Sequence, residues 1–113
     1  MAYDAELADR IREALSDQPQ VREVKMFGSL AFMVNGKMAV TANAEGQMML
    51  RCDPGRTDEF LAREGADWPE MQGKKMAKGW IIVDAHGIES EQAFGTWMSD
   101  ALEYNRKVSG SDD

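Results

Sequence analysis

Cys52 and His86 are the residues best suited to nucleophilic chemistry, because they are the only cysteine and the only histidine in the 113-residue chain. Both fall near the ends of predicted strands, and a thiol activated by a neighbouring imidazole is the simplest nucleophile of this kind. No further motif supports such a pair, and a small apolar cysteine in a buried strand needs no catalytic role. We therefore expect a non-enzymatic protein without catalytic residues, and a Cys52–His86 enzyme is the least favoured alternative.

A metal site is not predicted, because a structural zinc ion needs three or four clustered ligands. One cysteine and one histidine cannot supply them, and the aspartates and glutamates are scattered along the chain. A phosphate cradle is not predicted either, since no Gly-rich loop opens a helix. We expect neither a metal nor a cofactor.

The segment 71–79 is a basic island in an acidic chain. It holds Lys74, Lys75 and Lys78 without an acid, whereas 20 acidic against 13 basic residues give the whole chain a net charge of −7. Such a loop suits an anion or nucleic acid, but the net charge disfavours DNA or RNA, and no interleaved aromatic residues indicate base stacking. Solvated lysines that protect a sheet edge explain the segment more simply.

Nine methionines are many for this length, and several of them divide between the two faces of a predicted sheet. Met38 and Met48 alternate in step with apolar neighbours and are assigned to the core. Met33 and Met49 fall on the opposite face, which is more apolar than a solvated face requires. Either the chain itself or a partner covers that face, and we favour the chain because monomers rarely expose large apolar patches.

The tryptophans add one further candidate for binding. Trp80 and Trp97 fit the core, whereas Trp68 lies in an irregular segment and would anchor an interface if it were exposed. The candidate interaction surface therefore comprises Lys74, Lys75, Lys78, Trp68, Met33, Met49 and Arg51.

The helices and strands that position these residues are predicted to follow one another in the order α-β-β-β-β-α-β-α. Helical periodicity marks residues 4–18, 53–65 and 90–107, with Asp4, Asp53 and Ser90 as N-caps. Residues 21–52 alternate as four strands, with the hairpin signal Asn35-Gly36 between the second and third. Residues 80–84 form a further strand, and residues 65–79 are predicted to be irregular.

This order is typical of an α+β domain, with an antiparallel sheet of about five strands and helices packed on it. We assign residues 1–108 to a single domain and 109–113 to a disordered acidic tail. The composition is that of a globular protein, with 43% hydrophobic and 29% charged residues. Neither a signal peptide nor an apolar run of roughly 20 residues is present, so we expect a cytoplasmic protein that makes no membrane contact.

Several motifs resemble the TfoX (Sxy) N-terminal domain family. They are Lys25-Met26-Phe27-Gly28, Phe32-Met33-Val34-Asn35-Gly36-Lys37-Met38, Lys78-Gly79-Trp80, Trp97 in the last helix, and the opening Tyr3-Asp4-Ala5-Glu6-Leu7. The resemblance extends from Tyr3 to about Asn105, and Ser29 stands where the family often has glycine. It implies a stand-alone member of a family of bacterial competence regulators, which act with the cyclic-AMP receptor protein at promoters. The family has no established catalytic residues.

We therefore expect a regulatory or adaptor domain that binds a protein partner, in transcription or competence regulation by that resemblance. The alternative is a nucleic-acid-associated factor that uses the loop with Lys74, Lys75 and Lys78. A homodimer is compatible with both of these hypotheses and with a Cys52–His86 enzyme.

Overall fold

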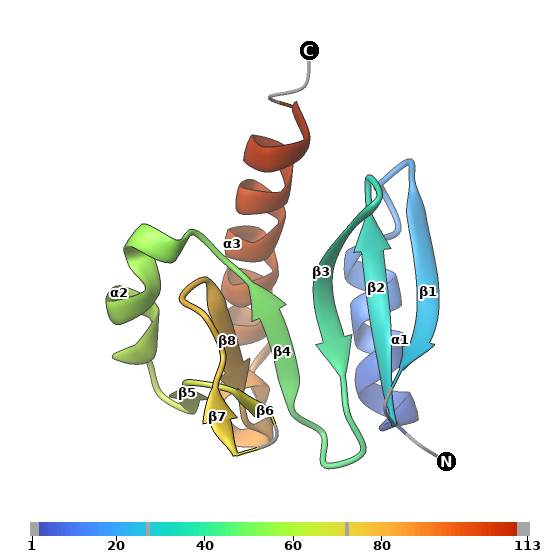
Figure 1. The fold of residues 1–113 in the computed structure, drawn as a ribbon. Coiled ribbons are helices and arrows are strands. Elements are labelled where there is room, and N and C mark those ends of the chain that lie inside the picture. The colour runs from blue at the N-terminus through green and yellow to red at the C-terminus, as the bar shows by residue number, and fades with distance from the viewer. Residues whose placement is uncertain (1–2, 27, 72, 111–113) are drawn as a thin grey trace.

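A computed structural model describes residues 3–26, 28–71 and 73–110 of the chain (Figure 1). The helices are α1 (Ala5–Ala14), α2 (Thr57–Leu61) and α3 (Glu91–Gly110), with the 3₁₀ turns η1 (Pro54–Arg56) before α2 and η2 (Ala85–Ile88) before α3. The strands are β1 (Val21–Met26), β2 (Ser29–Val34), β3 (Lys37–Ala42), β4 (Met48–Arg51), β5 (Ala66–Asp67), β6 (Glu70–Met71), β7 (Lys74–Lys75) and β8 (Trp80–Val83).

Side-chain caps begin the helical segments as the sequence predicts. Asp4 accepts a hydrogen bond of 2.9 Å from the amide three residues on, and Ser90 accepts one of 3.0 Å at the same spacing. Asp53 caps η1 through the amide of Gly55. The first helix ends at Ala14, earlier than predicted, and a turn then leads into Pro19, which has no backbone N–H for a helix.

The six-stranded sheet has the order β1-β2-β3-β4-β8-β5, and each neighbouring pair is antiparallel. Its first four strands are the predicted meander. Asn35 and Gly36 join β2 to β3 with φ angles of 54° and 81°, the left-handed conformations that a type I′ turn requires. The α+β class predicted from the sequence is confirmed.

The segment 65–79 is more regular than predicted. It contributes β5, which pairs with β8 and makes six strands instead of five, and the separate hairpin β6–β7. Gly73, with a φ angle of 80°, lies in the turn of that hairpin. Strands of two residues are too short to show an alternation, so the sequence pattern could not reveal them.

A β-bulge in the hairpin of β2 and β3 changes which side chains reach the core. Phe32 pairs with Val40, but Met33 pairs with Met38, so Ala39 is the extra residue. Ala39 is therefore buried in the core, whereas Met38 turns to the side of Met33 and is only half-buried. The assignment of Met38 to the core was wrong for this reason, and that of Met48 is confirmed.

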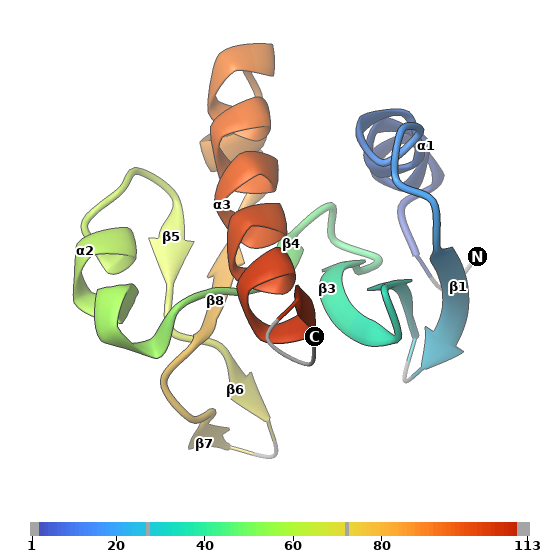
Figure 2. The same cartoon turned by 90° about the horizontal axis from the view of Figure 1, so that it is seen from above.

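The helices α1 and α3 lie on the same side of the sheet, and the hairpin β6–β7 lies on the other (Figures 1 and 2). The core fills the space between these helices and the strands, with Ile11 from α1 and Phe32 and Leu50 from the sheet fully buried. Phe60 from α2 reaches the same core and meets Trp97 at a ring-centroid distance of 5.8 Å.

The strands β3 and β4 pair only over residues 40–42 and 48–50, and they separate beyond that point. The C-terminal half of α3 packs along this gap (Figure 2). There Asn105, which is 3% exposed, donates a hydrogen bond of 3.0 Å to the carbonyl oxygen of Val34. It also accepts one of 3.2 Å from Asn35, and so ties α3 to the hairpin of β2 and β3.

The longest helix, α3, runs to Gly110, past residue 108 at which the sequence analysis places the domain boundary. The rest of the predicted tail, residues 111–113, lies outside the described residues, as does Phe27 of the first family motif. None of the helices in the described segments is long and apolar enough to cross a membrane.

Candidate interaction surface

The structure separates Cys52 from His86. Cys52 follows the end of β4 that pairs with Trp80, whereas His86 follows the end of β8 that pairs with Met48. The intervening four residue pairs span about 10 Å along the strands. Burial raises the pKa of the Cys52 thiol to about 11, so the thiolate is scarce at neutral pH. The two residues therefore do not form a nucleophile–base pair.

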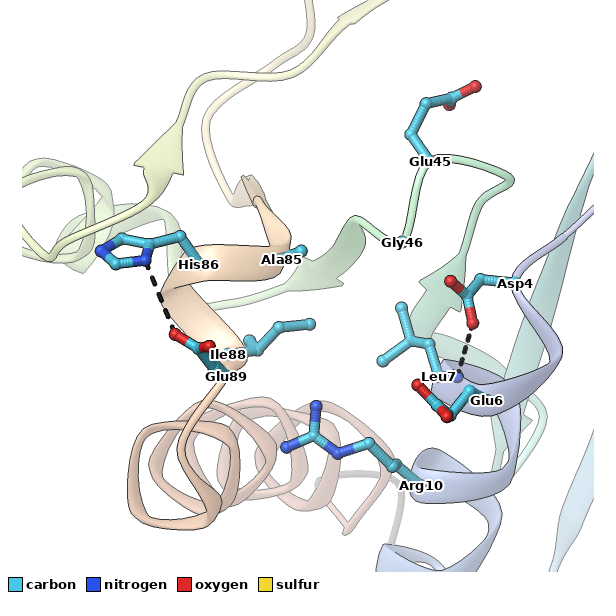
Figure 3. Close-up of a pocket in the computed structure, with 10 residues that line it drawn as sticks. All are labelled: Asp4, Glu6, Leu7, Arg10, Glu45, Gly46, Ala85, His86, Ile88 and Glu89. Atoms are coloured by element: carbon cyan, nitrogen blue, oxygen red, sulfur yellow. Dashed lines mark hydrogen bonds and ion pairs between the residues drawn. The ribbon is translucent and has the colours of Figure 1, made fainter.

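An acidic groove of about 500 Å³ lies between the start of α1, the turn after β3, and η2 (Figure 3). Some of its charged side chains have local partners: Asp4 caps α1, His86 lies 3.7 Å from Glu89, and Arg10 reaches Glu91 at 3.3 Å. Within the described residues, no three or more His, Cys, Asp or Glu side chains are grouped so that they could hold a metal ion. The groove is not evident in the sequence because its walls come from segments far apart in the chain.

The basic segment forms the hairpin β6–β7, and Trp68 helps to hold it in place. The indole N–H of Trp68 donates a hydrogen bond of 2.5 Å to the carbonyl oxygen of Met76, and the Lys75 ammonium lies 5.3 Å from the centre of the Trp68 ring. Trp68 is thus half-buried within its own loop instead of standing free as an anchor. Lys74 and Lys78 are exposed to solvent.

The second face of the sheet lies opposite α1 and α3 and carries the sequence candidates Met33 and Met49, and we call it the open face. The pairing register aligns one row of side chains across five strands on this side, namely Val24, Ala31, Thr41, Met49 and Ile82. The paired Met33 and Met38 extend it along β2 and β3. Of the helices in the described residues, α3 alone reaches this face, where its C-terminal half meets Met38 and Arg51 at the gap between β3 and β4, and none lies over the row itself (Figure 2). The sequence favours cover of this face by the chain itself, and the described segments provide it only on the side where the hairpin β6–β7 stands (Figure 2).

Two small residues of the open face are buried although no helix covers them. Ala31 is 0% exposed and Thr41 is 4% exposed, whereas their larger neighbours Met33 and Met49 are half-buried. The longer side chains beside Ala31 and Thr41 shield them, with Met49 the direct cross-strand partner of Thr41. The methionines therefore lie across the sheet as a flexible apolar layer.

Arg51 marks the end of the open face next to α3. It pairs across the strands with Trp80, and its guanidinium carbon lies 5.9 Å from the centre of that ring and 5.6 Å from the ring of Tyr104. Trp80, predicted to lie in the core, is instead half-buried beside Arg51, because Ile81 and Val83 take the core side of β8. Trp97 does lie in the core, as predicted.

Charge is divided unequally between the two sides of the molecule. The open face and its hairpin carry the bases Arg22, Arg51, Lys74, Lys75 and Lys78 against the acids Asp67 and Glu70. The groove beside α1 instead carries four acids, Asp4, Glu6, Glu45 and Glu89, with one arginine and one histidine. The strongly acidic chain thus presents a locally basic surface around an apolar centre.

The structure places the predicted candidates on two neighbouring elements. Met33, Met49 and Arg51 belong to the open face, and the lysines and Trp68 belong to the hairpin segment beside it. Sequence reasoning missed Met38, which the bulge redirects, and Ile82, whose alternation with Ile81 and Val83 was visible in the sequence.

These features define a small α+β domain with one helix-covered sheet face and one open, methionine-rich face rimmed by bases. The model of the TfoX N-terminal domain matches residues 13–104 of the chain. The chain therefore belongs to the TfoX N-terminal domain family, as its motifs predicted. A search of curated proteins found no match.

Proposed function

We propose that the protein is a non-catalytic regulatory or adaptor domain that binds a protein partner through the open face and the adjoining hairpin β6–β7. The observation that carries this proposal is the row of half-buried methionines and aliphatic residues with no helix of the described residues over it. Methionine side chains adapt to the shape of a partner, which makes such surfaces common in protein recognition.

Membership of the TfoX N-terminal domain family supports a regulatory role for this binding. We extend the proposal to the regulation of transcription or competence in the cytoplasm of a bacterium. The partner is then a protein of the transcription machinery or one of its regulators. Neither the proposed binding nor this regulation needs a catalytic residue or a cofactor.

Site-directed photo-crosslinking in native cells tests the proposal. A photoreactive residue at Met49 on the open face is compared with one at Glu13, which is exposed on α1. We expect a discrete crosslinked protein from position 49, in lysates with and without nuclease, and none from position 13. Equal products from both positions, or no product from position 49, would contradict binding through the open face.

A nucleic-acid-associated function is the second candidate, because Lys74 and Lys78 are exposed on the hairpin segment. Its signature is a crosslinked product that nuclease removes, and binding that falls steeply with salt. The variant with Lys74→Glu, Lys75→Glu and Lys78→Glu abolishes such binding. If the crosslinked protein at position 49 survives nuclease treatment, the nucleic-acid alternative is excluded for this face.

A further inference from the structure

We propose that the open face binds an acidic amphipathic helix of a partner protein, with the apolar side of that helix on the methionines and its carboxylates toward the basic rim. This inference rests on the proposed function and names the chemistry of the partner. It follows from the shape of the apolar row, the kind of side chains in it, and the charges around it.

The apolar row has the dimensions of a docked helix. It crosses the five strands β1, β2, β3, β4 and β8, which at about 4.8 Å per strand spacing gives a length of about 19 Å. A helix of about 13 residues has the same length, at 1.5 Å per residue. Ala31 and Thr41 lie in the middle of the row, beneath the longer side chains beside them, so a helix laid across the row would rest on those longer side chains.

The methionines make a helix a better occupant than a nucleic acid. Sheets that bind single-stranded RNA stack its bases on aromatic side chains. Among the described strand residues of this face the aromatic one is Trp80, and Arg51 already lies over its ring. Met33, Met38 and Met49 offer apolar contact without an aromatic ring, which suits leucine-like side chains of a helix.

The charges on the rim select an acidic partner. Arg22 lies on β1 and Arg51 on β4, both on the side of the apolar row where Met33 and Met38 lie, and Lys74 and Lys78 lie on the hairpin segment. A second copy docked by the same face would bring these bases against their equivalents, and like charges at an interface disfavour the complex. A helix with glutamates or aspartates on its flanks meets the rim with opposite charge.

Methyl NMR of the full chain with ¹³C-labelled methionine methyl groups tests the proposal. The probe is a 16-residue peptide with leucines at helical spacing on one side and glutamates on the other. A matched peptide has lysine in place of every glutamate, and a 15-nucleotide single-stranded oligothymidine serves as the nucleic-acid probe. We expect the acidic peptide to shift the methyl signals of Met33, Met38 and Met49, and to leave those of the buried Met48 and Met98 in place.

Charge variants connect the binding to the rim. The variant with Lys74→Glu, Lys75→Glu and Lys78→Glu is expected to weaken binding of the acidic peptide about tenfold. The single-site control variant Lys25→Glu changes an exposed base on the side of β1 that faces away from the open face, and is expected to weaken binding of the peptide less than twofold.

Three results would overturn the proposed partner chemistry. They are equal binding of the acidic and basic peptides, no methyl shifts up to millimolar acidic peptide, and shifts of the same methyl groups by the oligothymidine alone. If one of these results is obtained but photo-crosslinking at position 49 still captures a protein, the adaptor function is retained and only the acidic-helix assignment is rejected. If crosslinking at position 49 also captures no protein, the proposed function is rejected as well.

Discussion

Asn105 is the residue whose loss tests most directly how this fold is held together. It lies in the apolar stripe of α3, it is 3% exposed, and it makes two hydrogen bonds to the hairpin of β2 and β3. Replacement by alanine removes both bonds and leaves the carbonyl oxygen of Val34 without this partner in a buried position. The expected result is a marked loss of stability with little change in the fold.

The magnitude follows from the two bonds and the space that the shorter side chain leaves. Each hydrogen bond contributes about 1 kcal/mol net, and the cavity left in a buried position adds about 1 kcal/mol. Asn105→Ala should therefore lower the free energy of unfolding by about 2–4 kcal/mol. For a chain of this length, 1 kcal/mol corresponds to about 4 °C in Tm, so the midpoint should fall by about 8–16 °C. Urea unfolding followed by tryptophan fluorescence measures the difference, because Trp97 reports on the core.

Two control variants separate the contributions. Asn35→Gly keeps the left-handed backbone at φ 54° and removes only the side-chain donor to Asn105, so it should cost about 0.5–1.5 kcal/mol. Asn105→Asp can still accept from Asn35 but cannot donate to Val34, and should be at least as destabilising as alanine. A loss below about 1 kcal/mol for Asn105→Ala, or wild-type stability for Asn105→Asp, would refute this account of the α3 contact.

Three further predictions follow from other contacts. Because burial raises the pKa of Cys52 to about 11, its reaction with a disulfide reagent at pH 8 should be at least about 100-fold slower in the folded chain than in guanidinium; equal rates would show an accessible thiol. Arg12 holds the pKa of Glu23 below its usual value through hydrogen bonds of 2.6 and 2.8 Å, so this pair stabilises the fold above about pH 4.5 and the contribution is lost as the pH falls. Glu23→Gln should cost about 0.5–1 kcal/mol at pH 7 and almost nothing near pH 3 in urea titrations, and a pH-independent cost would contradict the assignment. A Cβ at Gly65 would lie 2.6 Å from an oxygen of a neighbouring carboxylate, whereas one at Gly73, with the same φ of 80°, has nothing within 4 Å. Gly73→Ala should therefore cost about 1 kcal/mol and Gly65→Ala at least about 2 kcal/mol more in thermal unfolding, and equal costs would exclude the packing argument.

Much of the fold could be predicted from local patterns. The caps Asp4, Asp53 and Ser90 each act on neighbouring amides, and the turn at Asn35 and Gly36 depends on two residues, so short segments carried enough information. The two-residue strands β5, β6 and β7 could not be predicted, because pairing with residues elsewhere in the chain defines them.

The candidate site was predictable in its elements but incomplete in its residues. Alternation placed Met33 and Met49 on the second face correctly. It placed Met38 in the core wrongly, because a bulge shifts the register by one residue. The local sequence contains no signal of that bulge. The acidic groove escaped notice because residues 4–10, 45–46 and 85–89 meet there only in the folded chain.

The position of β4 in the sheet has a consequence for biosynthesis. In the finished sheet β4 lies between β3 and β8, but β8 ends 32 residues after β4 in the chain. At a synthesis rate of about 5–20 residues per second, the edge of β4 waits roughly 2–6 s for its second partner. Its residues Met48, Met49 and Leu50 form an apolar, uncharged edge during that interval, while β1, β2 and β3 have already been made. Until β8 is made and has paired, this edge of β4 is therefore open to pairing with another chain.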